Sequence, residues 1–272
     1  MRKFFTAVIL AVFMFSAQIA AAADWNIVKH CNTKAELARW IEDGRREGQK
    51  AFNFTLSNFK VDNREELIKF GEELVNKIAV TISGSELSVD EYGIYGARFI
   101  YTIKKEYPGT RVANAYLSRN KEQSWMNLTA EEQKLYNIAV GIVDEANKRN
   151  SEVEKARYIH DEICKRVYDY KNENERNKTA IGALIDHYSQ CQGYSDAFYM
   201  LGRMCGLNIG RIGGIADGNG HEWNWITFID GKSYCIDVTL DDKRNSHEWF
   251  LATFEVMKRH HSCDWSVIPN LQ

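Results

Sequence analysis

The stretch SQCQGYSDAFYMLGRM, residues 189–204, decides how the second half of the chain is interpreted. Its apolar residues recur at the spacing of a helix that packs one side against a core. Cys191 stands at the start of this helix, where unpaired N–H groups and the helix dipole favour a negatively charged sulfur and suit an oxyanion. Gly193 is expected to keep side chains away from the thiol. We therefore interpret Cys191 as a nucleophile rather than a core thiol or half of a disulfide.

A thiol nucleophile needs a base, and residues 218–242, GNGHEWNWITFIDGKSYCIDVTLDD, offer one. His221 opens a strand rich in aromatic residues, Asp230 and Gly231 turn the chain, and a second strand is expected to carry Asp237. In such an arrangement the thiol gives its proton to the imidazole, and the carboxylate orients and stabilises the charged ring. The order predicts a triad of Cys191, His221 and Asp237.

The register of these two strands raises a difficulty for Asp237. An ideal two-residue turn at Asp230-Gly231 places Asp237 opposite Asn224 rather than near His221. A bulge or a longer loop must correct the register if Asp237 orients the imidazole. Asp241 is the alternative orienting carboxylate.

Four segments, taken in order, resemble the transglutaminase-like superfamily in its bacterial secreted branch. Its members carry a C-x-GYA-type segment, an H-x-W-N strand and a D-x-T strand. The resemblance implies an α+β, papain-like core, in which a helix bearing Cys191 packs on an antiparallel sheet bearing His221 and Asp237, preceded by an N-terminal α/β extension. It extends from about residue 151 to residue 261 and rests on residues 158–170, 191–214, 220–242 and 248–261.

The resemblance also implies an oxyanion donor upstream of the cysteine, acting with the N–H group of the cysteine itself. Tyr168, Tyr170 and Gln190 are the candidates. Asn224 matches the family's H-x-W-N pattern and serves either the site or only the sheet. We expect no cofactor and no metal, because the spacing of residues 260, 261 and 263 (His, His, Cys) matches no zinc motif.

The first residues predict export. Arg2 and Lys3 precede an apolar run over residues 4–15, and small residues lead to Asp24. This pattern is typical of a cleaved signal peptide, here residues 1–23. The run is too short for a permanent membrane helix, so we expect no membrane contact after cleavage, with a retained anchor as the alternative. The predicted location is secreted, periplasmic or otherwise in the cell envelope.

Composition narrows the class of partner. The chain has 272 residues and a formal charge of −2, which becomes −4 when the signal peptide takes two basic residues with it. This small net negative charge does not provide the basic surface that nucleic-acid binding requires. We expect a protein, peptide or cell-wall peptide as substrate. Six cysteines remain after cleavage, and in an exported protein they are either core thiols or disulfides.

The chain is expected to divide into an α/β region of unknown role over residues 24–150 and the transglutaminase-like domain over residues 151–272. Capping boxes at Thr129 and Ser151 open the two helices that flank this boundary. Within the first region the patterns predict the following elements: a helix from residue 33, a strand over 51–56, a helix over 63–80 and a hairpin over 96–117 with its turn at Pro108-Gly109.

These features together predict an exported cysteine enzyme that acts on peptide or side-chain amide bonds through a thioester on Cys191. Hydrolysis and transamidation share every step except the last acceptor, so the residue types do not separate a protease or amidase from a transamidase. The alternative is a non-catalytic module that binds peptide or cell wall on a transglutaminase-like fold.

Overall fold

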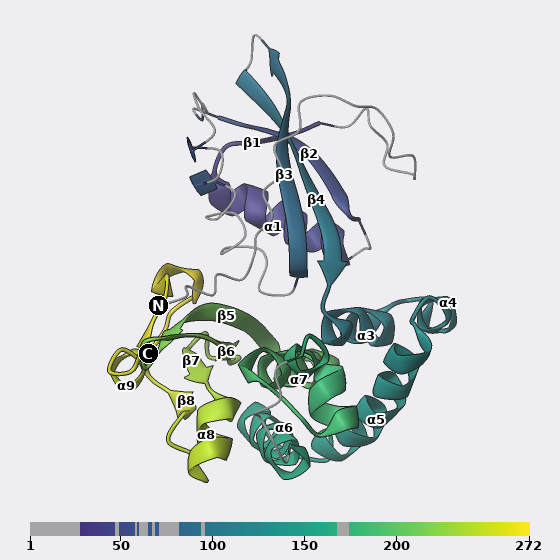
Figure 1. Cartoon of the computed structure of the whole chain (residues 1–272), viewed down its shortest axis with the longest axis vertical. Coiled ribbons are helices and arrows are strands. Elements are labelled where there is room, and N and C mark those ends of the chain that lie inside the picture. Colours follow the sequence, from purple (N-terminus) through teal and green to yellow (C-terminus); the bar gives the residue numbers. More distant parts are fainter. Residues whose placement is uncertain are drawn as a thin grey trace. The chain divides into compact units, whose positions relative to one another are not determined.

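The structure is a computed structural model. It describes residues 28–46, 49–57, 59, 65–66, 69–70, 82–93, 96–167 and 174–272. The predicted signal peptide lies outside these residues, as does most of the helix predicted over residues 63–80. The chain forms two compact units, residues 1–106 and residues 107–272. Figure 1 labels their elements.

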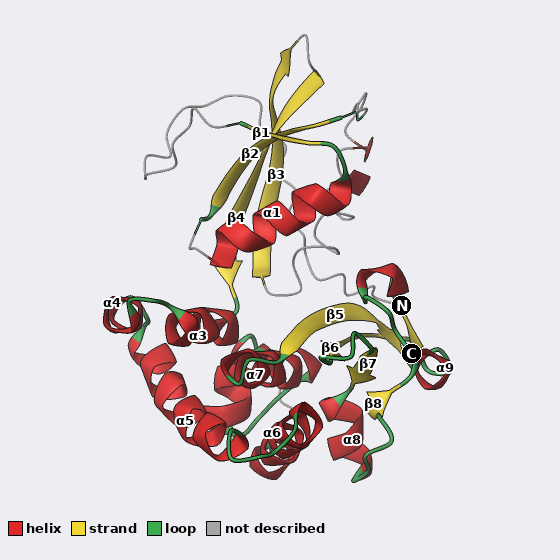
Figure 2. Cartoon of the chain, turned by 180° about the vertical axis from the view of Figure 1, so that it is seen from behind, coloured by secondary structure: helices red, strands yellow, loops and turns green. Residues whose placement is uncertain are grey.

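The described part of the first unit contains a four-stranded mixed sheet with a helix on one face. The strands are β1 (Lys29–Cys31), β2 (Ala51–Leu56), β3 (Ile82–Gly93) and β4 (Gly96–Glu106), in the order β1-β2-β4-β3. Helix α1 (Lys34–Arg46) connects the parallel strands β1 and β2 and crosses one face of the sheet (Figure 2). Thr33 caps this helix, because its hydroxyl accepts the Glu36 N–H at 3.1 Å.

The hairpin predicted over residues 96–117 is wrong. Strand β4 pairs with β3, which precedes it, and with β2. Pro108 does not turn the chain back but occupies the first position of helix α3 (Pro108–Leu117). Proline suits that position, since its fixed φ is already helical and the N–H it lacks would have no partner there.

The second unit begins with a layer of helices around α7 (Cys191–Met204). The others are α3, α4 (Lys121–Met126), α5 (Ala130–Ala146) and α6 (Glu152–Arg166), and α7 contacts α3, α5 and α6 (Figure 1). The capping box predicted at Thr129 and Glu132 is confirmed. Ser151 caps α6 as expected, but the Glu154 carboxylate reaches the N–H of Asn150 rather than that of Ser151.

The sheet of the second unit is antiparallel, with the order β8-β7-β6-β5-β9. Its strands are β5 (Asn208–Ala216), β6 (Asn219–Thr227), β7 (Ser233–Ile236), β8 (Phe250–Ala252) and β9 (His261–Ser262). Short helices α8 (Val238–Arg244) and α9 (Phe254–Met257) flank it. The other helical turns of this unit are η1 (Arg176–Lys178), η2 (Gly182–Asp186) and η3 (Trp265–Val267).

Side chains alternate between two cores on the two faces of this sheet. Ile226 and Ile236 join the larger core, which the helices cover, whereas Trp223 and Cys235 join a smaller core on the other face. This period-two alternation is the one expected of strands buried on both sides. The fold is therefore α+β, with helices packed on a curled antiparallel sheet, as predicted.

The compact second unit starts at Tyr107, whereas the sequence placed the boundary at residues 150/151. Helices α3 and α5 supply Val112, Leu135 and Ala139 to the same core as α7. The polar segment after α5 joins two helices that pack together, α5 and α6, rather than two units.

The six cysteines are free thiols, of which Cys31 and Cys235 are buried. Among the described residues, no helix combines the length and the apolar character needed to cross a membrane.

Candidate active site

Cys191 is the first residue of α7, where the sequence placed it, and it is partly exposed. A hydrogen bond fixes the loop before it, since the Gln190 N–H donates to the Asn177 carbonyl at 2.9 Å. The Cys191 thiol donates to Gln192 Oε1 at 3.8 Å. Its own N–H lies in the first turn, where N–H groups have no partner within the helix. The residue thus combines access to solvent with a fixed backbone and a donor beside the sulfur.

The role expected of Gly193 differs from the observed one. A Cβ at this position would overlap Ser189 Oγ and lie 2.5 Å from the Asn177 carbonyl oxygen. The glycine therefore lets the preceding loop pack against the first turn of α7, rather than clearing space around the thiol. It contributes to the site by allowing the loop to approach closely.

A longer loop corrects the register between the two strands. Residues 228–232 connect β6 to β7, so Asn224 pairs with Ile236 rather than with Asp237. A shift of one residue moves Asp237 to the face that carries His221. Strand β7 ends at Ile236, so Asp237 lies just beyond it and caps α8, with Oδ1 accepting the Leu240 N–H at 3.0 Å.

His221 donates through Nε2 to Asp237 Oδ2 at 2.7 Å. Burial opposes a charge on the imidazole, but the charge and hydrogen bond of Asp237, together with Cys191, raise the pKa of His221 to about 10. Burial likewise opposes ionisation of Asp237, yet its histidine partners hold the pKa of this carboxyl well below its ordinary value. The pair therefore favours an imidazolium next to a carboxylate.

His261 is a further residue at this site, although its sequence pattern suggested only a metal ligand. Its Nε2 donates to Asp237 Oδ2 at 3.0 Å, so one carboxylate oxygen receives two histidine donors. The His261 side chain is fully buried, and its ring packs edge-on against Trp223 and Trp249. Only the pairing of β9 with β5, which brings residues 261–262 to the site, could have revealed it.

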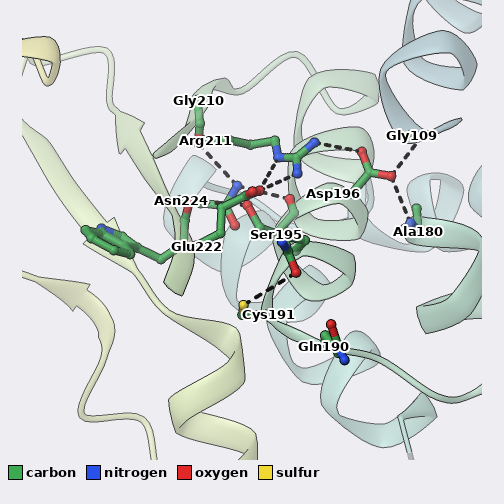
Figure 3. Close-up of polar contacts among 12 residues, drawn as sticks. Gly109, Ala180, Gln190, Cys191, Ser195, Asp196, Gly210, Arg211, Glu222 and Asn224 are labelled. Carbon is green, nitrogen blue, oxygen red and sulfur yellow. Dashed lines mark hydrogen bonds and ion pairs between the residues drawn. The ribbon is translucent and has the colours of Figure 1, made fainter. Parts of the chain in front are cut away.

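A buried ionic network joins the cysteine helix to the histidine strand (Figure 3). Asp196, on α7, accepts Arg211 Nη1 at 3.2 Å and the N–H groups of Gly109 and Ala180 at 3.1 and 2.8 Å. Arg211, on β5, donates through Nε to Glu222 Oε1 at 2.7 Å. Because Glu222 is adjacent to His221 in β6, the network fixes the elements that carry the thiol and the imidazole.

The remaining candidates divide into three groups. Asn224 is buried and donates to the carbonyls of Ser195 and Gly210, so it ties β6 to α7 and to β5. Gln190 is the residue before α7 and stands beside Cys191 (Figure 3). Tyr168 and Tyr170 lie outside the described residues.

Asp241, the alternative orienting carboxylate, contacts a different histidine. Its Oδ2 accepts from His160 Nε2 at 3.2 Å, and its Oδ1 accepts from Ser246 Oγ and from the Trp249 N–H. Among the two aspartates considered, Asp237 is thus the one bonded to His221.

Residues 137–254 match the family described as the transglutaminase-like superfamily. No curated protein matches the chain.

Solved structures give distant matches. One is described as a TGase (17% identity, TM-score 0.36, 70% of this chain and 51% of that chain). Two others are described as candidate proteases. One is a cysteine protease from Cytophaga hutchinsonii (13% identity, TM-score 0.32, 57% of this chain and 61% of that chain). The other is a protease from Parabacteroides distasonis (9% identity, TM-score 0.30, 56% of this chain and 39% of that chain). The chain thus spans between about two fifths and three fifths of the solved chains that it matches.

The family match begins within α5, covers α6, α7 and strands β5 to β8, and includes Cys191, His221 and Asp237. The chain therefore carries a domain of the transglutaminase-like superfamily.

Proposed function

We propose that the protein is an exported cysteine enzyme that cleaves amide bonds in peptides or in protein side chains. The observation that carries this proposal is the 2.7 Å hydrogen bond between His221 and Asp237, together with the contribution of Cys191 to the raised pKa of His221. An imidazolium held in this way can keep a neighbouring sulfur as thiolate and later deliver its proton. Export is part of the proposal and is supported by the N-terminal residues 1–23.

The proposed reaction starts with attack of the Cys191 thiolate on the amide carbonyl carbon. The negative charge moves to the carbonyl oxygen, where the N–H group of Cys191 at the start of α7 is placed to stabilise it. His221 donates its Nδ1 proton to the leaving nitrogen while Nε2 keeps its hydrogen bond to Asp237; the C–N bond breaks and a thioester remains on Cys191. Asp237 orients the ring and stabilises its charged form throughout.

Water then attacks the thioester and gives a proton to His221, which releases the acid and restores the thiolate. An amine in place of water would give transamidation. We propose water as the acceptor, since it is abundant at an exported site. The substrate class that follows is a protein, a peptide or a cell-wall peptide.

The test is covalent labelling of Cys191 by iodoacetamide and by an activated acyl ester, followed by intact mass measurement. Wild type, His221→Ala and Cys191→Ala are compared, with Cys191→Ala showing how much label other thiols take. The proposal expects fast labelling in wild type and a large loss of rate in His221→Ala. Equal, slow labelling in both proteins would instead favour a non-catalytic binding module. Products formed with and without a primary amine then separate transamidation from hydrolysis.

A further inference from the structure

A second group of histidine and aspartate side chains lies apart from the triad. Two sets of three such residues among the described ones have donor atoms within 4.8 Å of one another. One set surrounds Asp237, and the other consists of His160, Asp161 and His247. His160 and Asp161 belong to α6, whereas His247 follows α8, so the second set joins segments that are distant in the sequence.

The geometry of this second set resembles a coordination shell. Asp161 Oδ1 lies 2.9 Å from His160 Nδ1 and 2.9 Å from His247 Nε2. Ligands held about 2.0–2.2 Å from a tetrahedral zinc ion lie about 3.3 Å from one another. Small side-chain movements would therefore suffice for three bonds to one ion.

The second ring nitrogen of His160 has the partner that a ligating histidine requires. His160 Nε2 lies 3.2 Å from Asp241 Oδ2, and an ionised carboxylate only accepts, so Nε2 carries the hydrogen. Metal-binding histidines regularly donate their other N–H to a carboxylate in this way. His160 is 1% exposed, and its Nδ1 faces the carboxylate of Asp161. In the neutral form of the ring Nδ1 carries the lone pair, and a cation between Nδ1 and the Asp161 carboxylate would bind both.

The surroundings are negative and include a thiol. Cys164 Sγ lies 4.0 Å from His160 Nδ1. The carboxylates of Asp161 and Asp241 lie 2.9 and 3.2 Å from the two ring nitrogens of His160. A cation beside these carboxylates would be stabilised by the same charges.

We propose that His160 Nδ1, the Asp161 carboxylate and His247 Nε2 bind one zinc ion. Two imidazoles and a carboxylate form a donor set that suits zinc, and a soft sulfur borders the site. The side chains of Asp161 and His247 are 36% and 49% exposed, so the ion can enter from solvent and water can complete its coordination. The ion would link α6 to the segment after α8 and stabilise the folded chain; it takes no part in the chemistry at Cys191.

The experiment measures zinc binding to the full chain produced without a histidine tag. The protein is stripped with a chelator and titrated with zinc chloride against a chromophoric zinc indicator, and the thermal midpoint is recorded with and without zinc. The decisive variant is His247→Ala, which removes an exposed ligand. The matched control is His260→Ala, since His260 is also exposed (41%) and pairs with an aspartate, Asp217. His221→Ala tests the other set of donors.

Wild type, His260→Ala and His221→Ala are expected to bind about one zinc per chain and to gain thermal stability, whereas His247→Ala loses affinity by at least about tenfold and gains none. Zinc binding in His247→Ala equal to wild type overturns the proposal. So does loss in His221→Ala with retention in His247→Ala, which would move the ion to Asp237. Failure of wild type to bind zinc at micromolar concentration also overturns it. None of these results bears on the proposed amide chemistry.

Discussion

Asp237 and Asp161 are each bonded to two histidines through one oxygen, yet their surroundings differ. Asp237 Oδ2 accepts from His221 and His261 at 2.7 and 3.0 Å, and its side chain is 0% exposed. Asp161 Oδ1 lies 2.9 Å from both of its histidines, and the Asp161 side chain is 36% exposed. The residue types are the same in the two groups.

The two groups therefore differ in how deeply the carboxylate is buried and in which residues surround it. The buried carboxylate lies next to His221, whose pKa is raised by Asp237 and to a smaller extent by Cys191, and this arrangement suits proton transfer. The half-exposed carboxylate lies among further acids at a place that solvent reaches, and this arrangement suits a cation. The predictions below test whether the difference in surroundings decides the chemistry.

The largest effect is expected for Cys191→Ala. Loss of the nucleophile should lower the rate of amide cleavage by at least about 10⁴-fold, because triad enzymes lose at least this much without it. The fold should persist, since the thiol is small and partly exposed at a helix start. Turnover of a peptide amide and circular dichroism measure the two effects. Cys205→Ala, at the other end of α7, is the control and should keep full activity; retained activity in Cys191→Ala would place the nucleophile elsewhere.

Substitutions of Asp237 should give a graded loss. The two carboxylate oxygens of Asp237 accept hydrogen bonds from three donors: His221, His261 and the Leu240 N–H. The side-chain amide of an Asn variant has only one acceptor oxygen for these donors. We expect Asp237→Ala to lower single-turnover acylation by about 10³–10⁴-fold and Asp237→Asn by roughly tenfold less.

Asp241→Ala is the control for the Asp237 series. It should lower stability, because Asp241 is buried and accepts three hydrogen bonds, but leave the acylation rate per folded molecule near wild type. Acylation crippled only in the Asp241 variant would reverse the assignment.

Arg211→Met should produce the largest loss of stability. Arg211 is fully buried between the carboxylates of Asp196 and Glu222, and its removal leaves both charges without their partner. The free energy of unfolding should fall by about 3–5 kcal/mol. Denaturant titration measures it. Replacing all three residues together by uncharged ones should recover part of the loss, and failure to recover would mean that the network acts through packing rather than charge.

The raised pKa of His221 predicts a dependence of stability on pH. The pKa moves from its ordinary value of 6.5 to about 10, so the folded state holds this proton more tightly than the unfolded chain. The stabilisation is fully present below pH 6.5 and is lost as the pH rises through about 10. We expect a decline of about 2 kcal/mol or more, since one pKa unit corresponds to about 1.4 kcal/mol. The free energy of unfolding, measured between pH 6.5 and 10, should depend less on pH in His221→Gln than in wild type. Equal slopes against pH would show that His221 and Asp237 do not hold the proton.

The smallest effects compare the outer histidine of each group. His261→Phe keeps the packing against Trp223 and removes one hydrogen bond to Asp237, so acylation should slow by about tenfold. His247→Ala, its counterpart beside Asp161, should leave acylation within about twofold of wild type. Equal losses in both variants would mean that the two groups act as one unit.

Part of this arrangement could be predicted from local sequence. Helix caps, the apolar spacing of residues 191–204 and the aromatic strand after His221 are set by neighbours within a few residues, and the structure has these elements where the sequence placed them. The hairpin at Pro108 failed because proline suits both a turn and the first position of a helix, and only the packing of α3 decides between them.

The sequence by itself determined where the proposed nucleophile and base lie, Cys191 at the start of a helix and His221 in a strand, because these positions depend on local periodicity. Only the tertiary structure decided their partners. The loop of residues 228–232 turned Asp237 to the face of His221, strand pairing brought His261 to the same carboxylate, and the packing of α6 joined Asp161 to His247, 86 residues away. Contacts between distant segments follow from register and packing, and no local spacing encodes either of them.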